Sequence, residues 1–176
     1  MQFGKLNFTN ILSTPELVPG VVIHSVKSNN LENVLGAEID PSLADTAAFC
    51  EAYDVGMDVS ANCVVVEAKR GDKTWYAACM ILATNRADIN GVVRRTLDAR
   101  KISFAPMELA VGMTGMEYGG ITPIGIPADW PLIIDSRVND TEKIIIGSGF
   151  RSSKLLVDGK LLASLPNATV LNIVKE

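Results

Sequence analysis

The sequence predicts a single α+β domain built on a mixed β-sheet, and three observations lead to this prediction. Segments with strand character outnumber segments with helical periodicity, and they are joined partly by hairpins and partly across helices. The chain has 176 residues, which suits one domain with its own hydrophobic core. We therefore treat residues 1–176 as one domain in which residues 1–30 form an N-terminal extension, with neither an internal repeat nor an interior linker.

The first third of the chain contains two helix signals and one strand signal. Thr14-Pro15-Glu16 combines an N-cap residue, an N1 proline and a first-turn acid, which predicts a short helix that Pro19-Gly20 ends. A strand is expected over Val34–Ile39. Asp45 is then a plausible N-cap of a second helix, whose apolar residues recur at helical spacing, and Gly56 is expected to close it.

A β-hairpin is the clearest element of the middle of the chain. Asn62–Ala68 is apolar and β-branched, and Trp75–Ala83 returns after a turn around Gly71-Asp72. Asp88 can then cap a helix over Gly91–Leu97, with its valines and Leu97 facing inward. The middle of the chain thus supplies two paired strands and one helix.

The last part of the chain consists of short buried strands and two short helical segments. A helix is predicted from Pro106 to Val111, and a helical turn at Leu161–Leu165. The apolar composition predicts strands over Leu132–Ile134, Ile144–Ile146, Lys154–Val157 and Ala168–Val174. These strands complete the expected sheet.

Composition and charge narrow the possible functions. The net charge of −4 offers no general field that would attract nucleic acid, so such a partner needs a local patch. The densest basic cluster, Arg94-Arg95 followed by Arg100-Lys101, is either that patch or a solvated helix face. No apolar run approaches the roughly 20 residues of a membrane span, and the N-terminus lacks a targeting pattern. We expect a cytoplasmic protein with no membrane partner.

Metal, disulfide and triad chemistry are not expected. The three cysteines are widely spaced in apolar sequence, which favours buried reduced thiols, and no ligand cluster predicts a metal. His24 is the only histidine and no G-x-S-x-G elbow is present, so a histidine-based triad is not predicted. Gly147-Ser148-Gly149 is followed by strand-like sequence, which indicates a tight turn rather than a dinucleotide fingerprint. No cofactor is expected.

A glycine-rich loop is the strongest candidate for a ligand site. Val111–Asp135 holds five glycines and three prolines between two apolar runs, including Gly119-Gly120-Ile121-Thr122-Pro123. Glycine lets a ligand approach bare backbone, and proline fixes the adjacent bend, so such a loop can present N–H groups. If Gly120 lets the backbone approach the substrate carbonyl, Gly120→Val should remove hydrolysis, and the fold should survive that change if the loop lies at the surface. The alternative is a connection that merely turns a corner.

Several motifs, in this order, make the chain resemble the YbaK family of free-standing aminoacyl-tRNA deacylases and the editing domain of bacterial prolyl-tRNA synthetases. The resemblance spans about residues 34–174. Its motifs are Ile39-Asp40-Pro41 with Asp45-Thr46, VVVEAKRGD, Met113-Thr114-Gly115, Gly119–Gly125, Ile133-Ile134-Asp135 and Gly147-Ser148-Gly149.

The resemblance implies a mixed, partly barrel-like sheet flanked by helices, and hydrolysis of the ester that joins a wrong amino acid to tRNA. Gly119 and Pro123 match the family's G-x-x-x-P pocket loop. The predicted catalytic residues are Gly119, Gly120, Thr122 and Asn62. The predicted substrate-binding residues are Thr114, Gly115, Ile121, Pro123, Asp135, Ser148 and Gly149. The predicted tRNA contacts are Arg94, Arg95 and Lys101.

One position departs from the family pattern. The family usually places a lysine at the start of the strand that here reads ANCVVVEA, where it holds the nucleotide end of the substrate. Alignment on the hairpin gives Cys63 without a gap or Asn62 with one, and we select Asn62 because it is polar. An activated ester still needs only positioning, backbone donors and water, assisted by its own ribose hydroxyl.

Two functions follow from the resemblance. The first is a deacylase that binds the acceptor end of aminoacyl-tRNA. The second is a non-catalytic module that binds a tRNA 3′-end, an aminoacyl-nucleotide or an aminoacyl-tRNA synthetase. The edited amino acid, the tRNA and the oligomeric state stay open.

Overall fold

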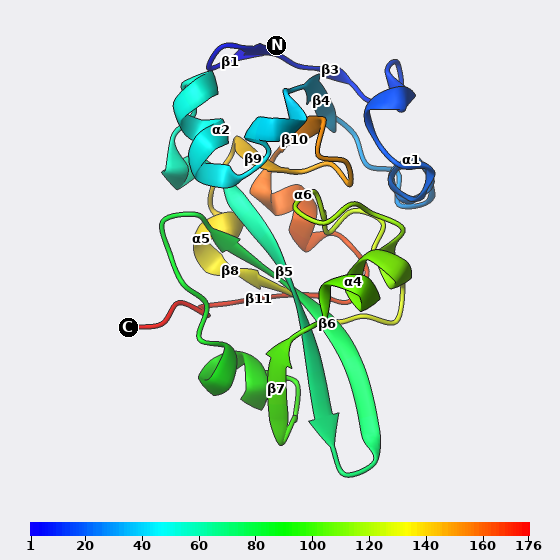
Figure 1. The fold of residues 1–176 in the computed structure, drawn as a ribbon, viewed down its shortest axis with the longest axis vertical. Coiled ribbons are helices and arrows are strands. Elements are labelled where there is room, and N and C mark those ends of the chain that lie inside the picture. Colours follow the sequence, from blue (N-terminus) through cyan, green and yellow to red (C-terminus); the bar gives the residue numbers. More distant parts are fainter.

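The computed structural model describes all residues from 1 to 176, and a five-stranded sheet forms its centre (Figure 1). The strand order is β11-β8-β6-β5-β7. β5 pairs with β6 and β7 antiparallel, whereas β8 pairs with β6 and β11 parallel, so the sheet is mixed. The strands are β5 (Ala61–Arg70), β6 (Lys73–Leu82), β7 (Lys101–Phe104), β8 (Leu132–Asp135) and β11 (Ala168–Leu171).

A second, antiparallel sheet of four strands has the order β3-β4-β10-β9. A parallel bridge between Ser60 and Ile145 links it to the first sheet, and both strand orders are open, so no closed barrel forms. A separate two-stranded ribbon, β1 (Gln2–Phe3) with β2 (Leu6–Asn7), starts the chain. The four strands are β3 (Thr9–Asn10), β4 (Leu35–Glu38), β9 (Ile144–Gly147) and β10 (Ser153–Val157).

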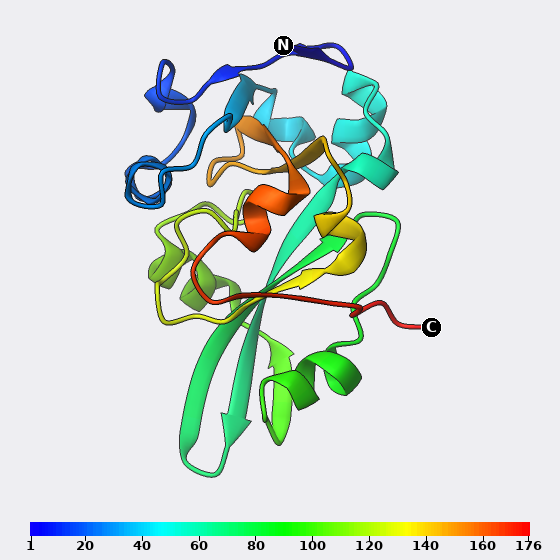
Figure 2. The same cartoon turned by 180° about the vertical axis from the view of Figure 1, so that it is seen from behind.

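Short helices flank these sheets. α2 and α4 lie on the side seen in Figure 1, whereas α5 and α6 lie nearer the viewer in Figure 2. The helices are α1 (Gly20–Ser28), α2 (Thr46–Tyr53), α3 (Arg94–Thr96), α4 (Met107–Thr114), α5 (Ser136–Asn139) and α6 (Gly159–Ala163). Three 3-10 turns occur at η1 (Pro15–Leu17), η2 (Pro41–Leu43) and η3 (Met57–Val59), and a π-helical turn, η4 (Ile89–Val93), precedes α3.

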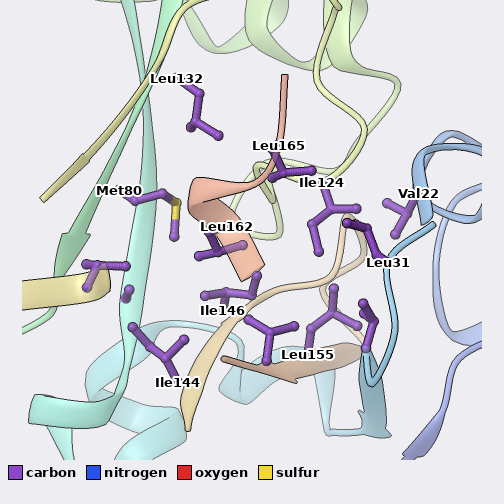
Figure 3. Packing of buried hydrophobic residues seen from close by; sticks show 14 of the residues in the cluster. Val22, Leu31, Met80, Ile124, Leu132, Ile144, Ile146, Leu155, Leu162 and Leu165 are labelled. Carbon is purple, nitrogen blue, oxygen red and sulfur yellow. The ribbon is translucent and has the colours of Figure 1, made fainter. Parts of the chain in front are cut away.

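The main hydrophobic core lies between the two sheets (Figure 3). It joins 21 buried residues, among them Met80 and Leu132 of the first sheet and Ile146 and Leu155 of the second, closed by Leu162 of α6. A second cluster of 10 buried residues packs the opposite face of β5 and β6 against η4 and against Leu97, the residue that follows α3. The first sheet is therefore covered on both faces around β5 and β6, which holds these long strands rigid.

The mixed α+β fold is confirmed, as are the predicted hairpin and most of the strands. The Asp88 carboxylate caps its helix by accepting hydrogen bonds from the N–H groups of Gly91 and Val92, each at 3.0 Å. No helix of the structure is long and apolar enough to span a membrane.

Some predicted element boundaries were wrong. Pro19-Gly20 begins helix α1 rather than ending one, because Pro19 is its N-cap and the apolar residues after it turn inward as a helix. α2 ends on Asp54, which adopts a left-handed conformation at φ 56°, instead of at Gly56. α4 continues to Thr114, and Lys101–Phe104 forms a strand that its polar residues concealed.

Candidate functional site

A cavity of about 370 Å³ lies where β5, the glycine loop and β10 meet. A volume of this size is typical of a small-molecule site. Its 18 lining residues come from the start of α2, the start of β5, the segment from β7 into α4, the glycine loop and the β9–β10 connection: Ala44, Asp45, Thr46, Ala61, Asn62, Cys63, Val64, Val65, Phe104, Ala105, Met107, Ala110, Tyr118, Gly119, Ile121, Gly147, Arg151 and Lys154. We call it the β5 cavity.

One wall of the β5 cavity is apolar. Cys63 and Val65 lie on the same face of β5, because side chains two residues apart in a strand share a face. Val65 packs with Ala110 of α4 and with Trp130, and Ile121 of the loop packs against them. Burial raises the pKa of the Cys63 thiol, so this residue stays neutral at physiological pH. The wall thus excludes water without contributing charge.

Other residues that line the cavity are polar or charged. Thr46 donates its hydroxyl hydrogen to the side-chain oxygen of Asn62 over 2.7 Å, which fixes the amide orientation. Asp45 is exposed beside this pair. The guanidinium of Arg151 donates to the carbonyl oxygens of Tyr118 at 3.3 Å and Pro41 at 3.2 Å, and so ties the glycine loop to the turn before α2. Lys154 supplies the third charged side chain of the cavity.

The glycine loop offers backbone donors to the cavity. Gly119 adopts a left-handed φ of 82°, a conformation that favours glycine. The N–H groups of Gly119 and Ile121 make no hydrogen bond within the protein, and both residues line the cavity. The N–H of Gly120 instead donates to the carbonyl of Glu117 over 3.0 Å. Two N–H groups of residues that line the cavity therefore have no partner within the protein.

Three of the predicted site residues line the β5 cavity: Asn62, Gly119 and Ile121. Gly120 is buried rather than on a surface loop, and a Cβ there would meet the carbonyl oxygen of Phe150 at 2.6 Å. Thr122 is fully buried, and its hydroxyl has no hydrogen-bond partner. These two residues lie next to the cavity in sequence without lining it.

Pro123 lines a different cavity, of about 630 Å³, between the end of the glycine loop and α1. The sole histidine, His24, lines that second cavity, where its ring lies 3.3 Å from the hydroxyl of Ser28. The glycine loop therefore separates two cavities, with Gly119 and Ile121 on one side and Pro123 on the other.

The other predicted substrate-binding residues are held in internal hydrogen bonds or turns, and none lines the β5 cavity. The buried carboxylate of Asp135 accepts from the backbone N–H groups of Arg137 at 3.0 Å and Ile173 at 2.9 Å. Ser148 bonds to the Ser153 hydroxyl at 2.7 Å. The remaining three are Thr114, whose hydroxyl donates to the Ala110 carbonyl, Gly115, which caps α4, and Gly149, which packs on Pro19.

The predicted tRNA contacts lie at the far end of β5. Arg94 and Lys101 line a third cavity of about 440 Å³ together with Lys69 and Arg100, whereas Arg95 lies outside it. Lys101 is the cross-strand partner of Lys69, and Lys69 shares its face of β5 with Val65. The Nε atom of Arg94 is buried and has no hydrogen-bond partner. We call this cationic surface the β7 groove.

Sequence reasoning missed Lys154 and Arg151, two of the three charged residues of the cavity. Lys154 interrupts an otherwise apolar stretch, SKLLV, and a charge inside a buried strand is the signal that could have identified it. Arg151 left no comparable signal, because its role depends on carbonyl groups that are distant in sequence. No group of three or more histidine, cysteine or acidic residues is placed to hold a metal ion.

Comparison with known proteins identifies the family. The sequence model of the aminoacyl-tRNA editing domain matches residues 40–165. A proline–tRNA ligase of Listeria monocytogenes serotype 4a (strain HCC23) is 22% identical over 134 residues; these cover 76% of the chain but 22% of the ligase, so the chain spans about a fifth of that enzyme.

Two solved structures share the fold. One, described as a candidate trans-editing enzyme for prolyl-tRNA synthetase, has a TM-score of 0.76 at 16% identity, covering 90% of this chain and 99% of the other. The second, a scaffold used for computational grafting of linear epitopes, has a TM-score of 0.76 at 17% identity, covering 89% and 96%. With a family match over most of its length, the chain belongs to the aminoacyl-tRNA editing domain family.

Proposed function

We propose that the protein is a trans-acting aminoacyl-tRNA deacylase that hydrolyses the ester of a mischarged tRNA in the β5 cavity. The observation that carries this proposal is the pair of unbonded N–H groups, on Gly119 and Ile121, beside an apolar wall. Such donors stabilise the negative charge that develops on an ester carbonyl oxygen during attack by water. Family membership and the prolyl-tRNA synthetase relatives support the same substrate class.

The chemistry proposed for this site is substrate-assisted. The aminoacyl ester is already activated, and the neighbouring ribose hydroxyl can orient the attacking water, so the protein mainly positions the ester. Thr46 and Asn62, held together by their hydrogen bond, form the polar side that would orient the ribose. The exposed carboxylate of Asp45 can pair with the α-ammonium group of the amino acid.

The β7 groove is the proposed contact for the tRNA backbone. Lys69 lies four residues beyond Val65 on the same face of β5, which places the groove roughly 13 Å from the cavity wall. Lys69 is ion-paired with Glu67 of the same groove at 2.7 Å, so Arg100 and Lys101 are the cations that can follow the phosphates of an acceptor stem whose 3′-end enters the cavity. We place this activity in the cytoplasm, where charged tRNAs are used.

The decisive experiment is to incubate the protein with a panel of charged tRNAs and to follow deacylation. Ala105→Trp places bulk in the β5 cavity, whereas Ala47→Trp places the same bulk on an exposed face of α2 outside the cavity. We expect deacylation by the wild type and by Ala47→Trp, and its loss in Ala105→Trp. Equal turnover by the two variants would show that the active site lies outside the β5 cavity.

The second candidate is a binding module without catalysis, and the start of β5 favours it. Cys63 and Asn62 both line the cavity, so neither alignment of the family lysine leaves a cation at this point of β5. Binding of charged tRNA without deacylation of any member of the panel would support the module. A synthetase partner would then be sought by co-purification with the full chain.

A further inference from the structure

Lys154 is a buried cation with no acidic partner. Its residue is 8% exposed, and its Nζ donates to the carbonyl oxygen of Ala44 over 3.0 Å. The same Nζ lies 5.2 Å from the centroid of the Phe49 ring. The three ion pairs of the chain, Lys69–Glu67, Arg70–Asp98 and Arg137–Asp135, all lie elsewhere. Lys154 therefore brings an unpaired ammonium group to the β5 cavity.

Burying an unpaired charge is unfavourable, so the position of Lys154 needs a physical explanation. Lysine is almost never buried without a counter-charge, and desolvation here lowers the pKa of Lys154 below its ordinary value. Of the groups around it, Asp45 and Cys50 favour the charged form and Arg151 opposes it. The ammonium has three donors, of which the Ala44 carbonyl takes one. The other N–H donors of the ammonium group can therefore bind an anion.

No other side chain of the cavity is as well suited to bind an anion as Lys154. The guanidinium of Arg151 already donates to two carbonyl groups. The start of β5 presents Ala61, Asn62 and Cys63 to the cavity, none of them a cation. An oxyanion that reached Lys154 would receive charge-assisted hydrogen bonds in a desolvated setting, where such bonds are strong. It would also neutralise the uncompensated charge.

We propose that Lys154 binds an oxyanion of the substrate inside the β5 cavity, either the 5′-phosphate of the terminal nucleotide or a side-chain carboxylate of the esterified amino acid. The inference rests on the proposed function, because it takes an aminoacyl-nucleotide end as the ligand. It adds a substrate-binding residue, on β10, to the donors of the glycine loop. The cavity then holds a cation for an oxyanion and, in Asp45, an anion for the α-ammonium group.

The test uses four non-hydrolysable 3′-aminoacylamino-adenosine analogues, alanyl or aspartyl, each with or without a 5′-phosphate. Dissociation constants are measured by calorimetry for the wild type, Lys154→Met, Lys154→Arg and Lys143→Met. Methionine keeps the length of the chain and removes the charge, while arginine keeps the charge. Lys143 is exposed and lies outside the β5 cavity, so its variant controls for net charge.

If Lys154 binds the 5′-phosphate, Lys154→Met should weaken the binding of both phosphorylated analogues by about 10- to 100-fold and leave the binding of the other two unchanged. If Lys154 binds the side-chain carboxylate, the same loss of affinity should occur for the two aspartyl analogues only. In either case Lys154→Arg should retain more affinity than Lys154→Met, and Lys143→Met should match the wild type. The melting temperature of Lys154→Met should not fall, because removing an unpaired buried charge is neutral or stabilising.

Three results would overturn the inference: unchanged constants for all four analogues, an equal loss for all four, or a wild type that binds none. An equal loss with a lower melting temperature would assign Lys154 to holding the Ala44 carbonyl instead. Because the analogues are not hydrolysed, the outcome is independent of catalysis. If the analogues bind through Lys154 but no charged tRNA is deacylated, only the proposed function is contradicted. If charged tRNA is deacylated but the Lys154 variants bind the analogues like the wild type, only the inference is contradicted.

Discussion

Gly120→Ala tests whether the glycine loop is held by its contact with the β9–β10 connection. The missing Cβ of Gly120 would lie 2.6 Å from the carbonyl oxygen and 2.7 Å from the carbonyl carbon of Phe150. Ordinary contacts between such atoms begin near about 3.5 Å, so the two segments must part by roughly 1 Å. Both atoms belong to the backbone, and no side-chain rotation can relieve the clash.

Three hydrogen bonds join the two segments and would be strained by that movement. The N–H of Gly149 donates to Gly120 O at 2.6 Å, the N–H of Glu117 to Gly149 O at 2.8 Å, and the N–H of Arg151 to the Glu117 carboxylate at 2.6 Å. A hydrogen bond contributes about 1 kcal/mol net, so losing two or three costs about 2–3 kcal/mol. For a chain of this size, that lowers the melting temperature by roughly 4–12 °C.

The deacylation rate of Gly120→Ala should also fall, even at temperatures where the variant is fully folded. A displaced loop misplaces the N–H groups of Gly119 and Ile121, and the loss of one oxyanion donor costs about 10²–10³ in rate. Thermal unfolding by circular dichroism and deacylation at a temperature well below the transition measure the two effects separately. Gly112→Ala, in α4 with open space around its Cβ position, is the control and should be neutral or stabilising. Wild-type melting and turnover in Gly120→Ala would refute the reasoning.

Four further outcomes are expected. If the cavity accepts a cation from β5, Cys63→Lys should tighten charged-tRNA binding and steepen its salt dependence by about one phosphate's share, and comparison with Asn62→Lys shows which position reaches the ligand. Arg94→Ala and Lys101→Ala should each flatten that salt dependence by a similar amount, measured by filter binding; an unchanged slope would exclude the β7 groove. Because burial lowers the pKa of Lys154, the unfolded state binds more protons below pH 10.5, so wild-type stability should rise relative to Lys154→Met as pH approaches 10.5. Chelation should leave deacylation unchanged, and a loss restored by zinc would contradict the metal-free site.

Local chemistry in the sequence was enough to predict several elements. The hairpin of β5 and β6 follows from β-branched runs around Gly71-Asp72, and the cap on η4 follows from Asp88. Both depend on neighbours in the chain, which a sequence displays directly. The boundary at Pro19-Gly20 could not be read this way, because the same two residues are suited to the end of one helix and to the start of the next.

The sequence pointed to only part of the candidate site. The motif order predicted a family that the comparisons then showed, and three residues of the predicted site, Asn62, Gly119 and Ile121, line the β5 cavity. Gly120 and Asp135 belong to conspicuous motifs for another reason: one permits a close backbone contact, and the other accepts two backbone N–H groups. A motif marks residues that the structure requires, and those need not touch a ligand.

By itself, the sequence determined the fold class, the hairpin, the short strands of the core and the family, because each depends on local composition or on motif order. Only the tertiary structure decided which face of β5 meets the glycine loop, which backbone N–H groups stay free, and that Lys154 enters the cavity from β10. These properties depend on contacts between segments that are distant in the sequence, such as Lys154 and Ala44, which are 110 residues apart. A sequence does not display such contacts, because the partner of a buried charge is set by packing rather than by spacing along the chain.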